Sequence, residues 1–215
     1  EIGSNVENNV SINANGENAF GRISFTRLDQ KGIHYNEDQS RNTFNASFTI
    51  TPSDRVTAST NFTYTNRASD NIAVQGYNFG AAFHWGIVRN YDMAYERKLF
   101  KEAGNQNTET ARGQVDNIFY RLNQENSLDR HRVFGNTNVV FKITDWLSAT
   151  ARVGLDHYDE YRKRITTSKT WSNINQGRGG AFNEDQLRVQ EINTDLFLSF
   201  DKTFGEIRVD GTAGG

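Results

Sequence analysis

Segments of alternating apolar and polar residues are joined in this chain by connections that are short and long in turn. A two-residue period predicts β-strands, because it places apolar side chains on one face of a strand and polar side chains on the other. We predict eight strands, at residues 8–15, 18–29, 43–51, 55–65, 132–144, 146–158, 187–202 and 206–213.

The connections have a strict order. Four of them, NGEN, TPSD, TDW and TFGE, are tight hairpin turns rich in Gly, Asn and Asp, and three are long loops at residues 30–42, 66–130 and 159–186. In an antiparallel meander, alternate connections lie at the same end, so all the turns gather at one end and all the long loops at the other. Outer-membrane β-barrels have this asymmetry, with short periplasmic turns and long extracellular loops.

On this interpretation the apolar face of the sheet contacts lipid and the polar face lines a water-filled lumen. The expected lipid-facing residues are Ile23, Phe25, Phe48, Ile50, Val139, Phe141, Val153, Leu196 and Leu198. Trp146 is expected at the periplasmic end of the apolar band, and Phe44, Tyr64 and Tyr158 at its loop end, as aromatic girdles. Alternation alone fits a soluble antiparallel sheet equally well, and it is the sorting of the loops that favours lipid.

The composition agrees with a sheet that has one face exposed to water. Only 35% of the residues are hydrophobic and mean hydropathy is −0.74, yet aromatic residues reach 12%, whereas disordered chains are poor in aromatics. No cysteine is present, which excludes disulfides and thiolate metal sites. No run approaches the roughly 18–20 apolar residues of a transmembrane helix.

The charge distribution and the N-terminal residues give no further class. The net charge is −2, and the sequence has no stripe of basic residues that would indicate nucleic-acid binding. The N-terminal EIGSNVENNV does not have the pattern of a signal peptide.

Two stretches, GRISFTRLDQKGI and RNTFNASFTITPSDRVTASTNFTYTNR, resemble early barrel strands of the SusC/RagA family of TonB-dependent outer-membrane transporters. RVFGNTNVVFKITDWLSATARVGLDHY is similar to the next hairpin of that family, and DLFLSFDKTFGEIRVDGTAGG to the one after it. The succession of these stretches covers nearly the whole chain. Thr26 and Arg27 stand where an aromatic is commoner.

The resemblance implies a plugged barrel of about 22 strands in the outer membrane of a Gram-negative bacterium. Such a barrel imports oligosaccharides or peptides with energy from the TonB complex, and a SusD-like lipoprotein commonly covers its mouth. Residues 1–215 would be an all-β, antiparallel transmembrane segment of that barrel domain, because eight strands cannot enclose a plug. We expect the plug, the TonB-contacting segment and the remaining strands to lie in other parts of a larger chain.

The long loop at 66–130 contains an aromatic and aliphatic stripe with a four-residue spacing, which predicts a helix near residues 79–102 that ends at Gly104-Asn105. The stripe consists of Phe79, Phe83, Ile87, Tyr91, Tyr95 and Leu99. Folded over the mouth, this helix would offer Trp85, Arg89 and Tyr91 to a sugar or peptide, and Trp171 is a similar aromatic in the third loop. Alternatively, the stripe packs the helix onto the barrel rim or a partner.

Other chemistry has little support in the sequence. The four histidines show no metal-ligand spacing. The acidic groups HYDEY and NEDQ are placed at strand ends or in loops, where a calcium site is conceivable but a solvated loop is favoured. The glycine-rich QGRGG follows no buried strand, and no constellation of catalytic residues is found, so we predict neither an enzyme nor a cofactor. The alternative function is a soluble carbohydrate-binding or adhesin domain that uses its loop aromatics.

Overall fold

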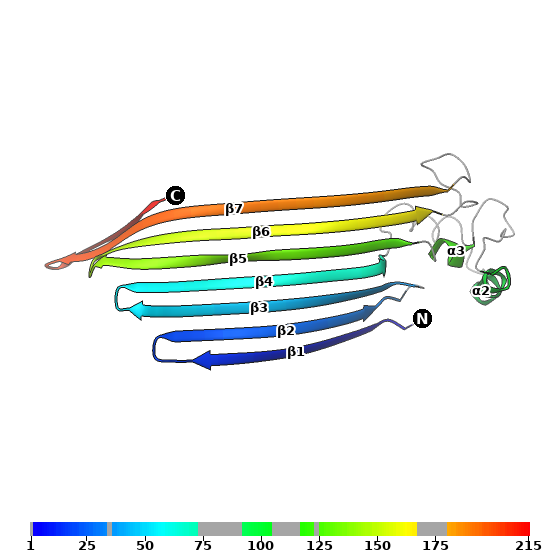
Figure 1. Cartoon of the computed structure of the whole chain (residues 1–215), viewed down its shortest axis with the longest axis horizontal. Coiled ribbons are helices and arrows are strands. Elements are labelled where there is room, and N and C mark those ends of the chain that lie inside the picture. The colour runs from blue at the N-terminus through cyan, green and yellow to red at the C-terminus, as the bar shows by residue number, and fades with distance from the viewer. Residues whose placement is uncertain (1, 34–35, 73–91, 105–116, 123–124, 167–179) are drawn as a thin grey trace.

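The structure, a computed structural model, describes residues 2–33, 36–72, 92–104, 117–122, 125–166 and 180–215. Its dominant feature is a single antiparallel sheet in which each strand pairs with the next along the chain, in the order β1-β2-β3-β4-β5-β6-β7-β8 (Figure 1). The strands are β1 Ser4–Asn15, β2 Ala19–Lys31, β3 Asp38–Ser53, β4 Val56–Asn71, β5 Asn126–Thr144, β6 Leu147–Thr166, β7 Ala181–Phe204 and β8 Ile207–Gly214. The predicted all-β antiparallel barrel segment is confirmed as a fold, and the sheet is open, with β1 and β8 at its edges.

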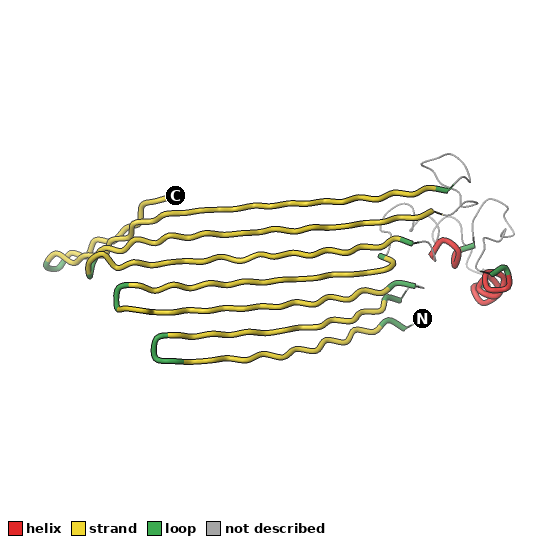
Figure 2. Tube along the Cα trace, viewed as in Figure 1, coloured by secondary structure: helices red, strands yellow, loops and turns green. Residues whose placement is uncertain are grey.

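The turns and the long connections lie at opposite ends of the sheet, as predicted, and we call these the turn end and the loop end (Figure 2). Each predicted tight turn joins its two strands. In the last of them Gly205 has a φ of +62°, a conformation that glycine adopts without steric cost. The Gly16 amide donates to the Ala19 carbonyl oxygen at 2.8 Å and closes the first turn.

The strands are longer at the loop end than the sequence pattern predicted. The long connections shrink to residues 32–37, 72–125 and 167–180, so the predicted limits 30–42, 66–130 and 159–186 are wrong at their edges. The clearest case is β6, which continues from 158 to Thr166, paired throughout with β7. Apolar alternation stops before these residues, but their backbone groups still pair across the ladder and their charged side chains pair across strands.

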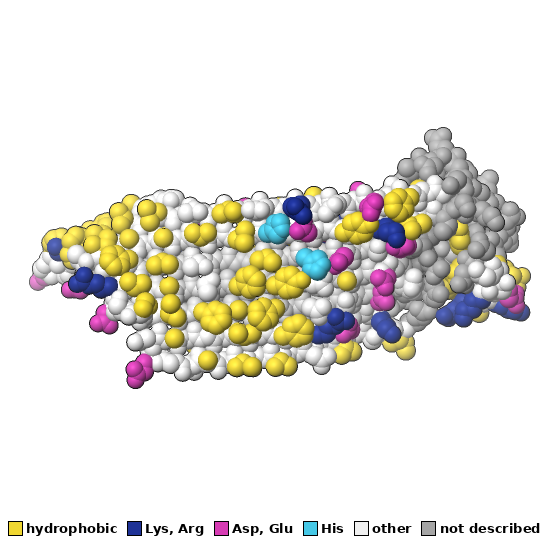
Figure 3. All heavy atoms as spheres, in the orientation of Figure 1, with side chains coloured by type: hydrophobic (Ala, Val, Ile, Leu, Met, Phe, Trp, Pro, Cys, Tyr) yellow, Lys and Arg dark blue, Asp and Glu magenta, His cyan; other side chains and the backbone are white. Residues whose placement is uncertain are grey.

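The sheet has two chemically different faces, fixed by its register. Ile23, Phe48, Val139, Leu196 and the other predicted lipid-facing residues all lie on one face, which we call the apolar face. Figure 3 views this face and shows hydrophobic side chains over the strands from the turn end to the middle, with charged and histidine side chains toward the loop end. Ser24, Asn45 and Thr63 lie on the other, polar face.

This sheet is a single layer. The chain exposes 14709 Å², whereas a compact soluble protein of this mass exposes about 10,000 Å². Large apolar side chains stand open to the surroundings, with Ile12 exposed at 70% and Leu196 at 60%. Among the described residues, the buried hydrophobic side chains gather mostly at the loop end, at Leu28, Phe100, Ile118, Phe119, Tyr120 and Leu128.

The described residues of the connection between β4 and β5 contain the helices α2 Met93–Glu102 and α3 Ile118–Leu122. The predicted helix near 79–102 coincides with α2 over its last ten residues. However, Asp92 is extended and caps α2 by accepting a hydrogen bond from the Tyr95 amide, so the helix begins at Met93 rather than running through from 79. Gly104, with a φ of +64°, follows its C-terminal end, as predicted. Residues 79–91 lie outside the described residues.

One glycine gives a direct test of the strand pairing. A Cβ atom at Gly135 in β5 would lie 2.1 Å from the Asn61 carbonyl oxygen of β4, whereas a Cβ at Gly154 in β6 meets no atom closer than 3.9 Å. We expect Gly135→Ala to lower the free energy of unfolding by about 1–3 kcal/mol, because the β4–β5 ladder must shift. Gly154→Ala, the control, should change it little. Urea denaturation measures both, and equal losses would contradict the pairing.

Candidate functional site

The four predicted ligand residues are not part of the described structure. Trp85, Arg89 and Tyr91 fall within residues 73–91 and Trp171 within 167–179. Their role in ligand binding therefore stays a prediction. The described residues offer three other functional surfaces: the apolar face, the polar face, and a charged margin at the loop end.

The apolar face carries a continuous apolar band with a sharp limit. The band consists of Ile23, Phe25, Phe44, Phe48, Ile50, Phe62, Val133, Val139, Phe141, Ile143, Val153, Leu155, Ile192, Leu196, Leu198 and Phe200. On β5 its apolar positions run from Val133 to Ile143, about 33 Å along the strand. At the 35–45° tilt of barrel strands this gives a height of about 25 Å, the height of the apolar band of outer-membrane barrels.

The turn end of the band carries aromatic side chains with a cation. The Lys202 ammonium lies 4.7 Å from the Trp146 ring centroid and 5.1 Å from that of Phe204. Amphipathic aromatics and lysines of this kind mark the boundary between an apolar layer and water. Trp146 thus lies at the short-turn end, as predicted.

At the loop end the predicted girdle is correct for two residues and wrong for one. Phe44 and Tyr64 are register partners on the apolar face. Tyr158 pairs with Arg132 and lies on the polar face, where the Arg130 guanidinium sits 5.0 Å from its ring centroid. Val153 and Leu155 of β6 lie on the apolar face, so Tyr158, an odd number of residues away, lies on the other face. The sequence pattern alone could have predicted this placement.

Immediately beyond the band, the same face becomes charged. We call the residues past this boundary the rim: Arg27, Asp29, Asn42, Asn66, Asp129, His131, His157, Asp159 and Arg188. Arg27 donates to Asp29 at 2.6 Å and to Asn42 at 3.1 Å, which links β2 to β3. Phe25, one step before Arg27 on this face, still belongs to the band.

The rim network continues across the next strands. Asn66 donates to Asp129 at 3.0 Å, and His131 hydrogen-bonds with the Tyr64 hydroxyl at 2.7 Å. Arg188 donates to Asp159 at 2.6 Å, and this hydrogen bond lowers the pKa of the Asp159 carboxyl, which lies beyond the band, below its ordinary value. The rim is therefore a belt of fixed, alternating donors and acceptors.

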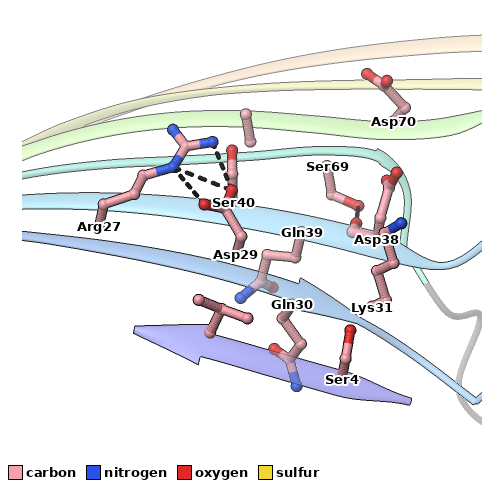
Figure 4. A pocket seen from close by; sticks show the side chains of 12 residues that line it. Ser4, Arg27, Asp29, Gln30, Lys31, Asp38, Gln39, Ser40, Ser69 and Asp70 are labelled. Carbon is pink, nitrogen blue, oxygen red and sulfur yellow. Dashed lines mark hydrogen bonds and ion pairs between the residues drawn. The ribbon is translucent and has the colours of Figure 1, made fainter. Parts of the chain in front are cut away.

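A cavity of about 520 Å³ opens among the loop-end residues of β1–β4. Figure 4 shows Arg27 and Asp29 joined on one side of it and Lys31, Asp38 and Asp70 around the rest. The Ser69 hydroxyl donates to the Asp38 carbonyl oxygen at 2.5 Å and holds the β3–β4 margin of the cavity together. The lining thus carries charges of both signs.

The polar face has hydroxyl and amide hydrogen bonds on β2–β4 and ion pairs on β5 and β6. On β2–β4, Asn45 accepts from the Thr63 hydroxyl at 2.9 Å and donates to that of Ser24 at 3.4 Å. On β5 and β6, Arg132 makes two hydrogen bonds with Asp156, at 2.9 and 2.5 Å. These are the Ser, Thr, Asn and Arg side chains that the sequence assigned to a wet surface.

Glu160 is the most buried charge of this face. Its side chain is 1% exposed and pairs with both Arg130 and Arg162. The sequence predicts HYDEY and NEDQ at strand ends or in loops. This is wrong for HYDEY, because residues 157–161 lie inside β6, whereas residues 183–186 lie at the start of β7, a strand end as predicted. The arginines at 130, 132 and 162, on the same face as Glu160, were the available signal. Among the described residues, no group of three or more His, Asp or Glu could hold a metal ion.

The α2–α3 pair forms a small core of its own at the loop end. Asn117 is fully buried and donates to both the backbone carbonyl and the carboxylate of Glu96 at 2.9 and 2.8 Å. Its own side-chain oxygen accepts from the Phe119 amide at 2.9 Å. Phe100 packs on Phe119 with 6.4 Å between ring centroids. The buried face of α2 is thus Glu96 and Phe100, while Tyr95 of the predicted stripe is exposed.

We expect Asn117→Ala to open this small core. It removes two donors from the buried Glu96, at a cost of about 1–3 kcal/mol to local stability. Hydrogen exchange of α2 should then accelerate, while exchange in β5 and β6 stays unchanged. Lys98→Ala, which removes an exposed 3.7 Å pair with Glu102, is the control and should leave exchange as it was. Faster exchange throughout the sheet would contradict a separate core.

Solved structures similar to this fold include three of one transport system. They are chains of the RagAB peptide importer in its "closed-closed" and "open-open" states and of the RagAB peptide transporter, each with a TM-score of 0.68 and 11% sequence identity. The matches cover 97%, 97% and 98% of this chain and 23%, 23% and 24% of those chains, so this chain spans about a quarter of their length. No protein-family model and no curated protein matches the sequence.

At 11% identity the likeness establishes the fold and not the activity. None of the described helices is long and apolar enough to cross a membrane.

Proposed function

We propose that this chain is part of the wall of a SusC/RagA-type transporter in the outer membrane, which imports oligosaccharides or peptides with energy from TonB. The observation that carries the proposal is the apolar band: a layer about 25 Å high, exposed on a single-layer sheet and limited by aromatic residues. In water such a surface is unfavourable, because soluble proteins rarely expose apolar patches of more than a few hundred Å². Lipid removes that cost.

The loop and turn ends follow from this placement. The turn end, with Trp146 and Lys202, faces the periplasm, and the loop end, with α2 and α3, faces the outside. The polar face, with its Ser, Thr and Asn side chains, lines the lumen. The similar solved structures are peptide importers by name, which supports the transporter class, and a SusD-like lipoprotein at the loop end is the expected partner.

The alternative, a soluble carbohydrate-binding or adhesin domain, is disfavoured by the same band. A soluble sheet protein covers its apolar face with a second layer, and in the described structure no helix or sheet lies over the band. The described helices, α2 and α3, contact each other at the loop end.

Nutrient uptake by cells that carry the full-length protein tests the proposal. We expect deletion of its gene to abolish uptake of one class of oligosaccharide or peptide, and loss of TonB to have the same effect. Uptake unchanged across both classes, or a protein recovered in the soluble fraction without detergent, would contradict the transporter.

A further inference from the structure

The rim is a surface that the proposed function leaves without a role. It begins directly after the band on the same face, where Arg27 follows Phe25 and Asn66 follows Tyr64. A side chain on the lipid-facing surface just outside the apolar layer lies at the level of lipid head groups. The rim inference therefore rests on the proposed function, because it requires the band to be in lipid.

The height of this charged surface decides which head groups it suits. On β6 the strand continues from His157 to Thr166, about 30 Å along the strand and about 23 Å above the band at barrel tilt. Phospholipid head groups occupy only about 5–8 Å on each side of the hydrocarbon layer. At β6 the sheet thus extends about three times further than a phospholipid head-group layer, and there it matches a leaflet with larger head groups.

The chemistry of the rim favours sugars over phosphates. Carboxylates at Asp29, Asp129 and Asp159 accept, while guanidinium and amide groups at Arg27 and Asn66 donate. A sugar hydroxyl both donates and accepts, so it can join such pairs without separating them. A phosphate only accepts, and it would meet the carboxylates at close range.

The cavity at the loop end of β1–β4 gives this surface depth. By register, Arg27, Asp29 and Ser40 line it from the apolar face. Its volume of about 520 Å³ lies within the range of small-molecule sites, about 300–1,000 Å³. The rim is therefore more than a flat margin, since it contains a recess next to the band.

We propose that the rim and its cavity bind the sugar head groups of a glycolipid in the leaflet at the loop end. The acyl chains of that lipid lie on the band, and its sugars lie against Arg27, Asp29 and their neighbours. The protein thereby selects its annular lipids on the outer side of the membrane.

Lipid retention tests this proposal with the full-length protein. The protein is reconstituted in phosphatidylcholine vesicles that contain equal small amounts of an uncharged diglycosyl diacylglycerol and of phosphatidylglycerol, and native mass spectrometry then identifies the lipids it retains. We expect the diglycosyl lipid to be enriched about threefold over its share in the vesicle, as one or two additional hydrogen bonds would give. The double variant Arg27→Ala with Asp29→Ala should lose this enrichment, since it removes a rim pair without leaving a lone charge.

Two further double variants complete the design. Asp201→Ala with Arg208→Ala removes a matched ion pair of 2.5 Å on the polar face at the turn end and should keep the enrichment. Asp159→Asn with Arg188→Gln disrupts the rim on β6 and β7 and should reduce it, which covers the case that the first variant misfolds. Enrichment of phosphatidylglycerol alone, or equal retention by all variants, would overturn the proposal. A protein that fails to float with the vesicles would instead overturn the proposed function, and with it the rim.

Discussion

Replacing Leu198 by arginine should lower the stability of the barrel in lipid by about 2–4 kcal/mol, because the guanidinium would lie within the hydrocarbon layer. Leu198 is 48% exposed on the apolar face and pairs in register with Ala149 and Ala213, so no polar neighbour on those strands can receive the charge. Urea titration of the full-length protein in phospholipid vesicles measures the loss.

Ser199→Arg is the matched control. Ser199 follows Leu198 on β7 but lies on the polar face, where its hydroxyl is 3.0 Å from that of Thr212. A charge there meets water, so the change in stability should stay within about 0.5 kcal/mol. Equal effects of the two arginines would mean that the faces do not differ in their surroundings, and the larger effect at Ser199 would mean that they are reversed.

The second large effect is expected at the Arg130–Glu160 pair. Arg130→Met leaves the carboxylate of Glu160, 1% exposed, with Arg162 as its remaining partner. Removing one member of a buried pair costs about 3–5 kcal/mol when nothing replaces it. We expect about 2–3 kcal/mol here, because Arg162 still compensates part of the charge. Urea titration in vesicles reports the loss.

Arg208→Met provides the comparison for this pair. Arg208 and Asp201 form an ion pair of the same kind, but their side chains are 66% and 54% exposed. Exposed pairs contribute about 0–1 kcal/mol. If both methionine variants lost the same small amount, the burial of Glu160 would have no energetic consequence.

The strands and their order were predictable because the apolar band imposes a two-residue period on every strand that crosses it. Ile23, Phe48 and Leu198, for example, are apolar residues between polar neighbours, and this alternation identifies their strands in the sequence. Beyond the band the apolar face carries charged residues and the polar face includes apolar ones such as Leu28 and Leu128, so Asp129 and Asp159 show no regular alternation although they lie in strands with a complete ladder. Hydrophobic alternation therefore marks where a strand is half apolar, and it underestimates how far the strand extends.

The functional surfaces were less predictable, for a related reason. The rim depends on which side chains become neighbours across strands, as in Arg27 with Asn42, and these partners are 15 residues apart in the chain. Once the strand register is known, the alternation of side chains along β6 places Tyr158 and Glu160 on the polar face. The spacing of the stripe gave no sign that a helix begins at Met93, where Asp92 caps α2.

The most direct test of the central claim, that the apolar face contacts lipid, introduces single cysteines into these 215 residues, which have none, after any cysteine elsewhere in the full-length protein is replaced by serine. Single variants of the full-length protein, Leu196→Cys and Leu198→Cys on the apolar face and Asp195→Cys and Ser199→Cys on the polar face, are treated in intact membranes with a membrane-impermeant maleimide. We predict an alternating result along β7, with Asp195→Cys and Ser199→Cys labelled and the two leucine positions protected. Labelling of all four positions alike would contradict the claim.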